Sequence, residues 1–131
     1  MARAAVGADV SKSLWIARGA LAGLWGYEGL WLKVIARDAH EKAIVAHALG
    51  PFHVAPGMAM LAIGLCETAL AAAILSGVQS YRLAWFQLVV LLLMHGTATL
   101  SGSLADPADL WAHSLPTYAC VLFLILNGRR K

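Results

Sequence analysis

Residues 58–76 read MAMLAIGLCETALAAAILS, an apolar segment in which Glu67 is the one charged residue. At a rise of 1.5 Å per residue, a helix of this length spans a hydrocarbon core about 30 Å thick. The breaker pair Pro56-Gly57 precedes the segment and Gly77 follows it. This stretch therefore predicts a transmembrane helix.

Three more segments have the length and apolar character of a membrane span, namely 13–34, 83–100 and 107–127. Asp106 and Pro107 have the sequence of an N-cap and first helical residue, and Pro116 predicts a kink in the last helix. We therefore expect an all-α, four-transmembrane-helix bundle that forms a single membrane domain over residues 1–131.

The composition supports a membrane protein and argues against other classes. Hydrophobic residues make up 60% of the 131 residues and charged residues 13%, and the mean hydropathy is +0.71. The net charge of +3 comes from basic residues near helix ends rather than from a basic stripe, so no nucleic-acid partner is expected. Cys66 and Cys120 lie in apolar runs without CxxC spacing, which predicts neither a disulfide nor a zinc site.

The distribution of Lys and Arg predicts the orientation, because cytoplasmic loops are enriched in these residues. One side of the predicted bundle has Lys33, Arg37 and Lys42. The other side has the remaining basic residues: Arg3, Lys12, Arg18, Arg82, Arg129, Arg130 and Lys131. We therefore expect a multi-pass protein of the inner (cytoplasmic) membrane with both termini in the cytoplasm.

The longest predicted connection, 35–56, lies between the first two helices on the outer side. Residues 40–49 have a helix-compatible pattern with a broad apolar face. This short helix in the outer loop either lies on the membrane surface or packs as a cap over the bundle.

Ionisable side chains within membrane spans are costly, which makes them candidates for function. Glu28 and His95 are predicted at matching depth, roughly 8 to 9 Å below the outer surface at 1.5 Å per residue. Glu67 is predicted one to two turns deeper, and His113 is predicted near the outer rim. We therefore expect these four side chains to converge in the outer half of the bundle.

Two interpretations of this polar group stay open. Carboxyl and imidazole groups in apolar surroundings can bind a ligand or accept protons. The same side chains can instead hold helices together, with Glu28 paired to Lys33 or His95. No His-x3-His or Glu-x-x-His spacing occurs, so no metal site is predicted.

The first helix contains four glycines that thin its surface, at Gly19, Gly23, Gly26 and Gly29. Small residues at such spacing let another helix approach closely. The pattern predicts helix packing there, against a helix of this chain or of another.

Several motifs together resemble the DoxX-like family of small membrane proteins. They are Arg18, Tyr27-Glu28-Gly29-Leu30 with Lys33, the helical outer loop ending near Pro51, Gly64-Leu65-Cys66-Glu67 and the short basic loop at Arg82. The resemblance covers about Trp15 to Gly128. It implies a four-helix membrane bundle and an association with respiratory redox chemistry, because related DoxX and DoxD proteins are linked to quinone reduction during thiosulfate oxidation.

Our leading hypothesis is a redox-associated accessory protein that binds a quinone or lipid, or docks on a larger respiratory-type complex. Its expected partners are the bilayer and other membrane subunits or a second copy, with no cofactor of its own and no enzymatic activity by itself. An alternative is a purely structural subunit of a multi-subunit membrane assembly. A third is a quinone-reducing oxidoreductase subunit.

Overall fold

The computed structural model describes residues 2–78, 80–100 and 107–128, and within them every regular element is helical. The elements are α1 (Ala2–Gly26), the π-helical segment η1 (Tyr27–Ile35), α2 (Ala39–Leu49), the short 3₁₀ turn η2 (Gly50–Phe52), α3 (Pro56–Ser76), α4 (Ser80–Leu100) and α5 (Pro107–Gly128). The prediction of an all-α protein is confirmed. Three described helices are long and apolar enough to cross a membrane, over Pro56–Ser76, Tyr81–Leu100 and Leu110–Gly128.

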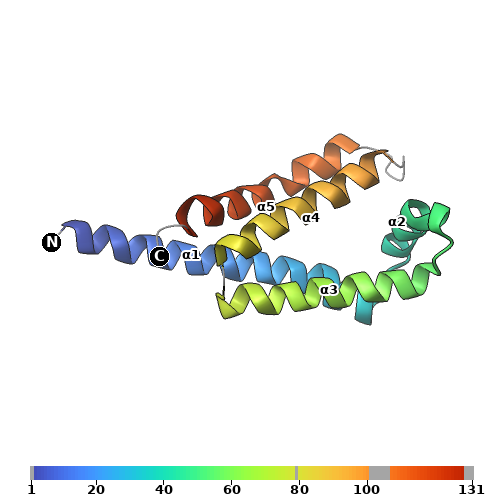
Figure 1. Ribbon diagram of the computed structural model, residues 1–131, viewed down its shortest axis with the longest axis horizontal. Coiled ribbons are helices and arrows are strands. Elements are labelled where there is room, and N and C mark those ends of the chain that lie inside the picture. The colour runs from blue at the N-terminus through green and yellow to red at the C-terminus, as the bar shows by residue number, and fades with distance from the viewer. Residues whose placement is uncertain (1, 79, 101–106, 129–131) are drawn as a thin grey trace.

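The helices form two pairs (Figure 1). α1 and η1 pack against α3, whereas α4 packs against α5. The pairs join where α1 contacts α5, near the start of α4 and the end of α5, and they diverge toward α2 at the opposite end. This divergence leaves room between the pairs at the α2 end.

An apolar core holds the two pairs together where they converge. Leu21 and Trp25 of the first helix, Ile74 of α3, Ala84 of α4 and Leu124 of α5 are all buried in it. The indole Nε1 of Trp25 donates a hydrogen bond to Gln87 Oε1 at 3.1 Å, which satisfies two buried polar groups within this core.

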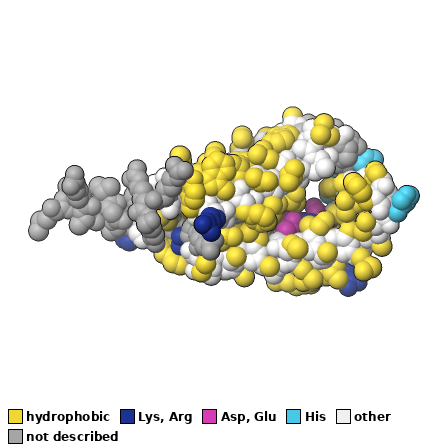
Figure 2. All heavy atoms as spheres, viewed as in Figure 1, with side chains coloured by type: hydrophobic (Ala, Val, Ile, Leu, Met, Phe, Trp, Pro, Cys, Tyr) yellow, Lys and Arg dark blue, Asp and Glu magenta, His cyan; other side chains and the backbone are white. Residues whose placement is uncertain are grey.

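The outer surfaces of the pairs are apolar (Figure 2). Exposed large side chains include Ile16, Met58, Leu93 and Leu126, with at least one on each long helix. A surface of this kind suits lipid rather than water. The helices therefore have the character of membrane-embedded elements in contact with the bilayer.

The first helix is longer than its apolar segment. The sequence places the span at 13–34, whereas α1 begins at Ala2 and continues through η1 to Ile35. Hydropathy identifies only the residues that suit a lipid environment. The N-terminal residues before the span are rich in alanine, which favours a helix in water as well as in lipid. The helix passes without interruption through Pro116 in α5, and the kink expected there stays a prediction.

Arg18 belongs to the contact between α1 and α3 at the convergent end. Its side chain is buried, with the guanidinium 5.1 Å from the ring centroid of Trp15. Gly77, at the C-terminal end of α3, has a positive φ of 69°, and a Cβ placed on it would lie 2.9 Å from Nη1 of Arg18. The cation thus packs at a helix C-terminus, where the helix dipole favours positive charge.

The first helix approaches α3 very closely at Gly29 and Gly64. A Cβ on Gly29 would lie 2.7 Å from the Gly64 carbonyl oxygen and 2.6 Å from Cβ of Glu67. A Cβ on Gly64 would lie 2.8 Å from the Gly29 carbonyl oxygen and from Cβ of Lys33. Because backbone atoms are in the way, neither position has room for a side chain.

The other predicted packing glycines differ from Gly29. Gly26 makes ordinary contact, since a Cβ there would lie 3.9 Å from Cβ of Ala71. Gly19 and Gly23 are exposed, with no described atom within 4 Å of a Cβ position. Of the four, Gly29 is therefore the one that makes a close helix crossing within the chain.

Replacing Gly29 by Ala is expected to lower the free energy of unfolding by about 1 to 3 kcal/mol, because the methyl group forces the two backbones apart. Gly23→Ala is the matched control and is expected to be neutral or stabilising by up to about 1 kcal/mol, because Ala favours helix over Gly. Denaturant unfolding in detergent measures both. Equal stability of the two variants would contradict the crossing.

Candidate functional site

A lysine ammonium surrounded by carboxylates lies beside the Gly29–Gly64 crossing. Nζ of Lys33 is 3.0 Å from Oε2 of Glu67 and 3.2 Å from Oε2 of Glu41. Oε2 of Glu28 is 3.7 Å away, and Nζ also donates to the Glu28 carbonyl oxygen at 3.5 Å. We call these four residues the Lys33 cluster.

The members of the Lys33 cluster differ in burial. The side chains of Lys33 and Glu67 are only 3% and 5% exposed, whereas those of Glu41 and Glu28 are 22% and 37% exposed. The cluster is thus one buried ion pair with two further carboxylates that reach its edge. Such a pair is tolerated because each charge has its counter-charge within hydrogen-bond distance.

Glu41 reaches the cluster because α2 starts where it does. Oδ1 of Asp38 accepts hydrogen bonds from the backbone N–H groups of His40 and Glu41, at 2.9 and 3.1 Å, as an N-cap does. α2 is also held by apolar contact of Val45 with Ala59 and Met60 of α3. The loop helix therefore adds a third element to the site.

Sequence reasoning missed one member of this cluster and the burial of another. Lys33 was counted as an outer basic residue and was one of two partners considered for Glu28; the structure shows the Lys33–Glu28 pair, with the lysine buried. Glu41 was not considered. A signal for the burial of Lys33 was present, because two carboxylates within apolar spans require a nearby cation. Lys33 also lies five residues after Glu28, which is the hydrogen-bond spacing of a π-helix. The sequence offers no comparable signal for Glu41, since its position depends on how the loop helix folds back.

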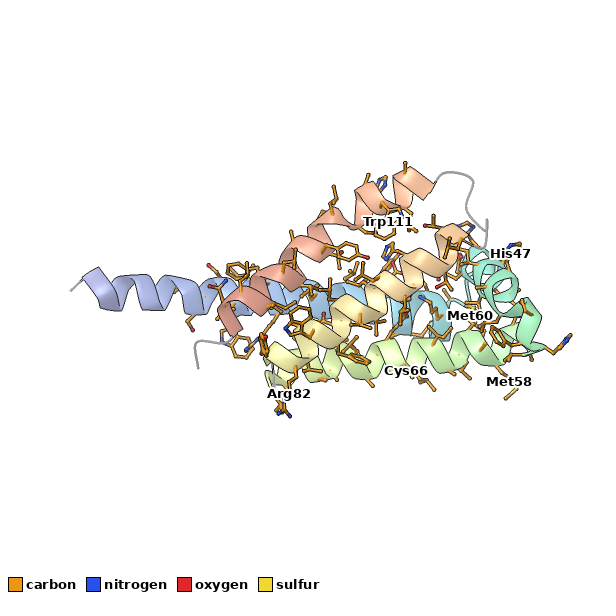
Figure 3. The ribbon with its side chains drawn as sticks, turned by 45° about the horizontal axis from the view of Figure 1, so that its top comes forward. His47, Met58, Met60, Cys66, Arg82 and Trp111 are labelled. Atoms are coloured by element: carbon orange, nitrogen blue, oxygen red, sulfur yellow. The ribbon has the colours of Figure 1, made fainter. Side chains whose placement is uncertain are left out.

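A second polar group lies between α4 and α5. The His95 ring nitrogens Nδ1 and Nε2 are 2.7 Å from the Leu91 carbonyl oxygen and 2.6 Å from Oγ of Ser114. The Tyr118 hydroxyl is 3.3 Å from Nδ1. Trp111 covers the ring at a centroid distance of 5.3 Å and comes from the α5 segment labelled in Figure 3.

The hydrogen bonds of His95 assign its protons. A carbonyl oxygen only accepts, so Nδ1 carries a proton and donates it to Leu91. Nε2 then accepts from the Ser114 hydroxyl in the neutral ring. Ser114 Oγ also lies 2.7 Å from the Leu110 carbonyl oxygen, so it can turn to donate there and accept from a protonated Nε2. The Ser114 hydroxyl can therefore either donate to Nε2 or accept from it.

A cavity of about 340 Å³ separates the Lys33 cluster from His95. All four residues that were expected to converge line it, namely Glu28, Glu67, His95 and His113, together with Lys33, Glu41 and Ser114. Figure 2 shows acidic side chains within the hollow between the helix pairs. The structure thus brings the predicted group around one space.

A second cavity of about 560 Å³ adjoins the first at Lys33, Glu41 and Glu67. Its walls are mostly apolar and are formed by α2, α3 and α4, with side chains that include Ile44, Leu49, Phe52, Ile63, Leu70, Phe86 and Val90. Trp25 lines both cavities. Together they form a space with a polar part and an apolar part.

No metal centre is formed by the described part of the chain, where no three His, Cys, Asp or Glu side chains are grouped to hold a metal ion. The arrangement instead combines hydrogen-bonding and charged groups with an apolar chamber. Such a combination of features suits an amphipathic molecule with a hydrogen-bonding head.

Comparison with protein families matches residues 22–127 to the DoxX-like family. The chain belongs to the DoxX-like family. The matched range contains the Lys33 cluster, His95 and His113, so the site of this DoxX-like protein lies wholly within the family's own region. Comparisons of the DoxX-like chain with curated proteins and with solved structures find no significant match.

The charge pairing in the Lys33 cluster is expected to be strongly coupled. Lys33→Met leaves a buried carboxylate unpaired and is expected to destabilise by about 3 to 5 kcal/mol. Glu67→Met is expected to destabilise less, because Lys33 keeps Glu41 and Glu28 as partners. The double variant is expected to lose less free energy of unfolding than the two single variants lose in sum. Denaturant unfolding in detergent measures the cycle, and strictly additive losses would show that the two side chains do not interact.

Proposed function

We propose that this DoxX-like membrane protein is a redox-associated accessory protein that binds a quinone-like or lipidic molecule between its two helix pairs. The observation that carries the proposal is the junction of a polar and an apolar cavity at Lys33 and Glu67. An amphipathic molecule matches this division, with its polar head near the Lys33 cluster and His95 and its apolar part in the second cavity.

The dimensions support a small-molecule site. Ligand pockets commonly enclose about 300 to 1,000 Å³ and combine apolar walls with a few convergent polar groups. The two cavities, of about 340 and 560 Å³, fall in that range separately and together. Phe52 and Phe86 give the apolar cavity aromatic walls, which suit a flat ring or a prenyl chain.

The redox association follows from the family resemblance, and docking to other subunits has its own support. Gly19 and Gly23 leave a thin, exposed face on α1 with no described atom against it. Another membrane helix packs closely on such a face. This face also favours the second candidate, a structural subunit of a larger assembly. In either case we propose that electron carriers belong to a partner.

We further propose four spans, with the 13–34 segment of α1 and η1 as the fourth, in the inner membrane with both termini cytoplasmic. The distribution of basic residues supports this orientation. Burial of Lys33 strengthens it, because only Arg37 and Lys42 then remain as basic residues of the outer connection.

The proposed orientation is expected to show in reporter fusions. Green fluorescent protein fused after Lys131 should fluoresce, and alkaline phosphatase fused there should be inactive, because both termini lie in the cytoplasm. Alkaline phosphatase fused after His53, in the turn between α2 and α3, should be active. The reverse pattern would invert the topology.

Ligand binding is expected to fall when a large side chain fills the place where the two cavities meet. Ala98 lines both cavities, so Ala98→Phe should exclude the ligand. Ala72 is exposed on α3, and Ala72→Phe is the matched control. Each protein is purified gently from its native membrane, and extracted quinones and lipids are quantified by mass spectrometry.

We expect wild type and Ala72→Phe to retain one enriched quinone or lipid. Ala98→Phe is expected to retain at least tenfold less of that species. Retention by Ala98→Phe, or a wild-type protein with no species enriched over the bulk membrane, would contradict the proposed site. A stable complex with other subunits and no bound small molecule would instead favour the structural candidate.

A further inference from the structure

Glu67 has a carboxylate oxygen that the protein does not use. Oε2 forms an ion pair with the Lys33 ammonium at 3.0 Å, and neither Oε2 nor Oε1 accepts a hydrogen bond of normal geometry from any described residue. The side chain is only 5% exposed, and it lines both cavities where they meet. Because buried polar atoms nearly always have partners, Oε1 marks where a ligand atom is held.

The chemistry of the missing partner follows from the oxygen itself. A carboxylate paired with an ammonium is a hydrogen-bond acceptor only. It therefore attracts an O–H or N–H group and repels the lone pairs of a carbonyl oxygen. A head group that presents only acceptors does not suit this end of the cavity.

The charge balance decides between a neutral and a cationic donor. The two fully buried charges, those of Lys33 and Glu67, already cancel one another. The remaining carboxylates, of Glu28 and Glu41, pair with the same ammonium and are 37% and 22% exposed, so they are not part of the fully buried charge balance. The buried part of the site thus requires a donor but no further positive charge.

We infer that the ligand binds through a neutral hydroxyl head group that donates a hydrogen bond to Oε1 of Glu67. This inference rests on the proposed function and sharpens it, because it specifies the head group of the amphipathic ligand. For a quinone-type ligand it means that the hydroquinone form, whose hydroxyls donate, binds more tightly than the quinone form, whose carbonyls only accept.

Other groups around the polar cavity are compatible with a hydroxyl head. A hydroxyl donates one hydrogen bond and accepts others. His95 and Ser114 line the same cavity from α4 and α5, and both have atoms that donate. Their protons are already engaged with one another and with backbone carbonyl oxygens, so the contact with Glu67 is the one that selects the head group.

The test compares two matched probes, a hydroquinone and its quinone with the same short prenyl tail. The full-length protein is reconstituted in lipid nanodiscs, and binding is measured without oxygen as ligand retained above that of empty nanodiscs. We expect the hydroquinone to bind at least tenfold more tightly than the quinone.

Glu67→Gln tests the assigned oxygen, because an amide presents both a donor and an acceptor. We expect it to reduce the preference for hydroquinone toward equal binding, mainly by improving quinone binding. Asp38→Asn is the matched control, since it makes the same carboxylate-to-amide change outside the cavities and Asn is an equally good N-cap. We expect it to keep the wild-type preference.

The wild-type ratio decides the inference even if Glu67→Gln does not fold. Equal binding of the two forms, or tighter binding of the quinone, would overturn the hydroxyl assignment and leave the proposed ligand site standing. Displacement of the hydroquinone by dodecylammonium more readily than by dodecanol would overturn it in favour of a cationic head. Binding of neither quinone form, by a protein that also enriches no quinone or lipid from its native membrane, would refute the proposed function itself.

Discussion

The structure depends on burying one cation, the Lys33 ammonium, within apolar helices. A buried ammonium without counter-charges is prohibitively costly, so carboxylates have to come within about 3 to 4 Å of it. Glu67 reaches it from α3 only because the two helices nearly touch, and they touch only because Gly29 and Gly64 lack side chains. The glycine pair and the ion pair are therefore one requirement, and together they place the first helix on α3.

The same requirement explains the space between the helix pairs. The charged groups come from η1, α2 and α3, whereas α4 and α5 bring His95, whose ring is already hydrogen-bonded to Leu91 and Ser114. Both helix pairs bring polar groups to this space, among apolar side chains such as Leu24 and Leu91. The pairs close where Leu21, Trp25 and Leu124 pack, and they remain apart where polar groups face the cavity.

The sequence predicts those features that depend on one segment at a time. Hydropathy locates the apolar helices, and depth along each helix is enough to bring Glu28, Glu67, His95 and His113 to one region. It does not predict features that depend on how two segments pack against each other. Helix phase decides that Gly29 rather than Gly19 or Gly23 meets α3, and the fold of the loop helix decides that Glu41 reaches Lys33. Lys33 was counted among the basic residues of the outer side because topology rules use position along the chain, not burial.

Stability alone gives little reason for this polar interior. Replacing a buried ion pair by apolar side chains of similar volume is often neutral or stabilising, so a charge cluster is a poor way to hold helices together. Close packing at Gly29 and Gly64 would survive such a replacement. The replacement would remove the acceptor oxygen of Glu67 and the polar wall opposite His95, which are the features that distinguish one end of the cavity from the other. The charges are therefore better explained by the ligand that we propose for the cavity than by the bundle that surrounds it.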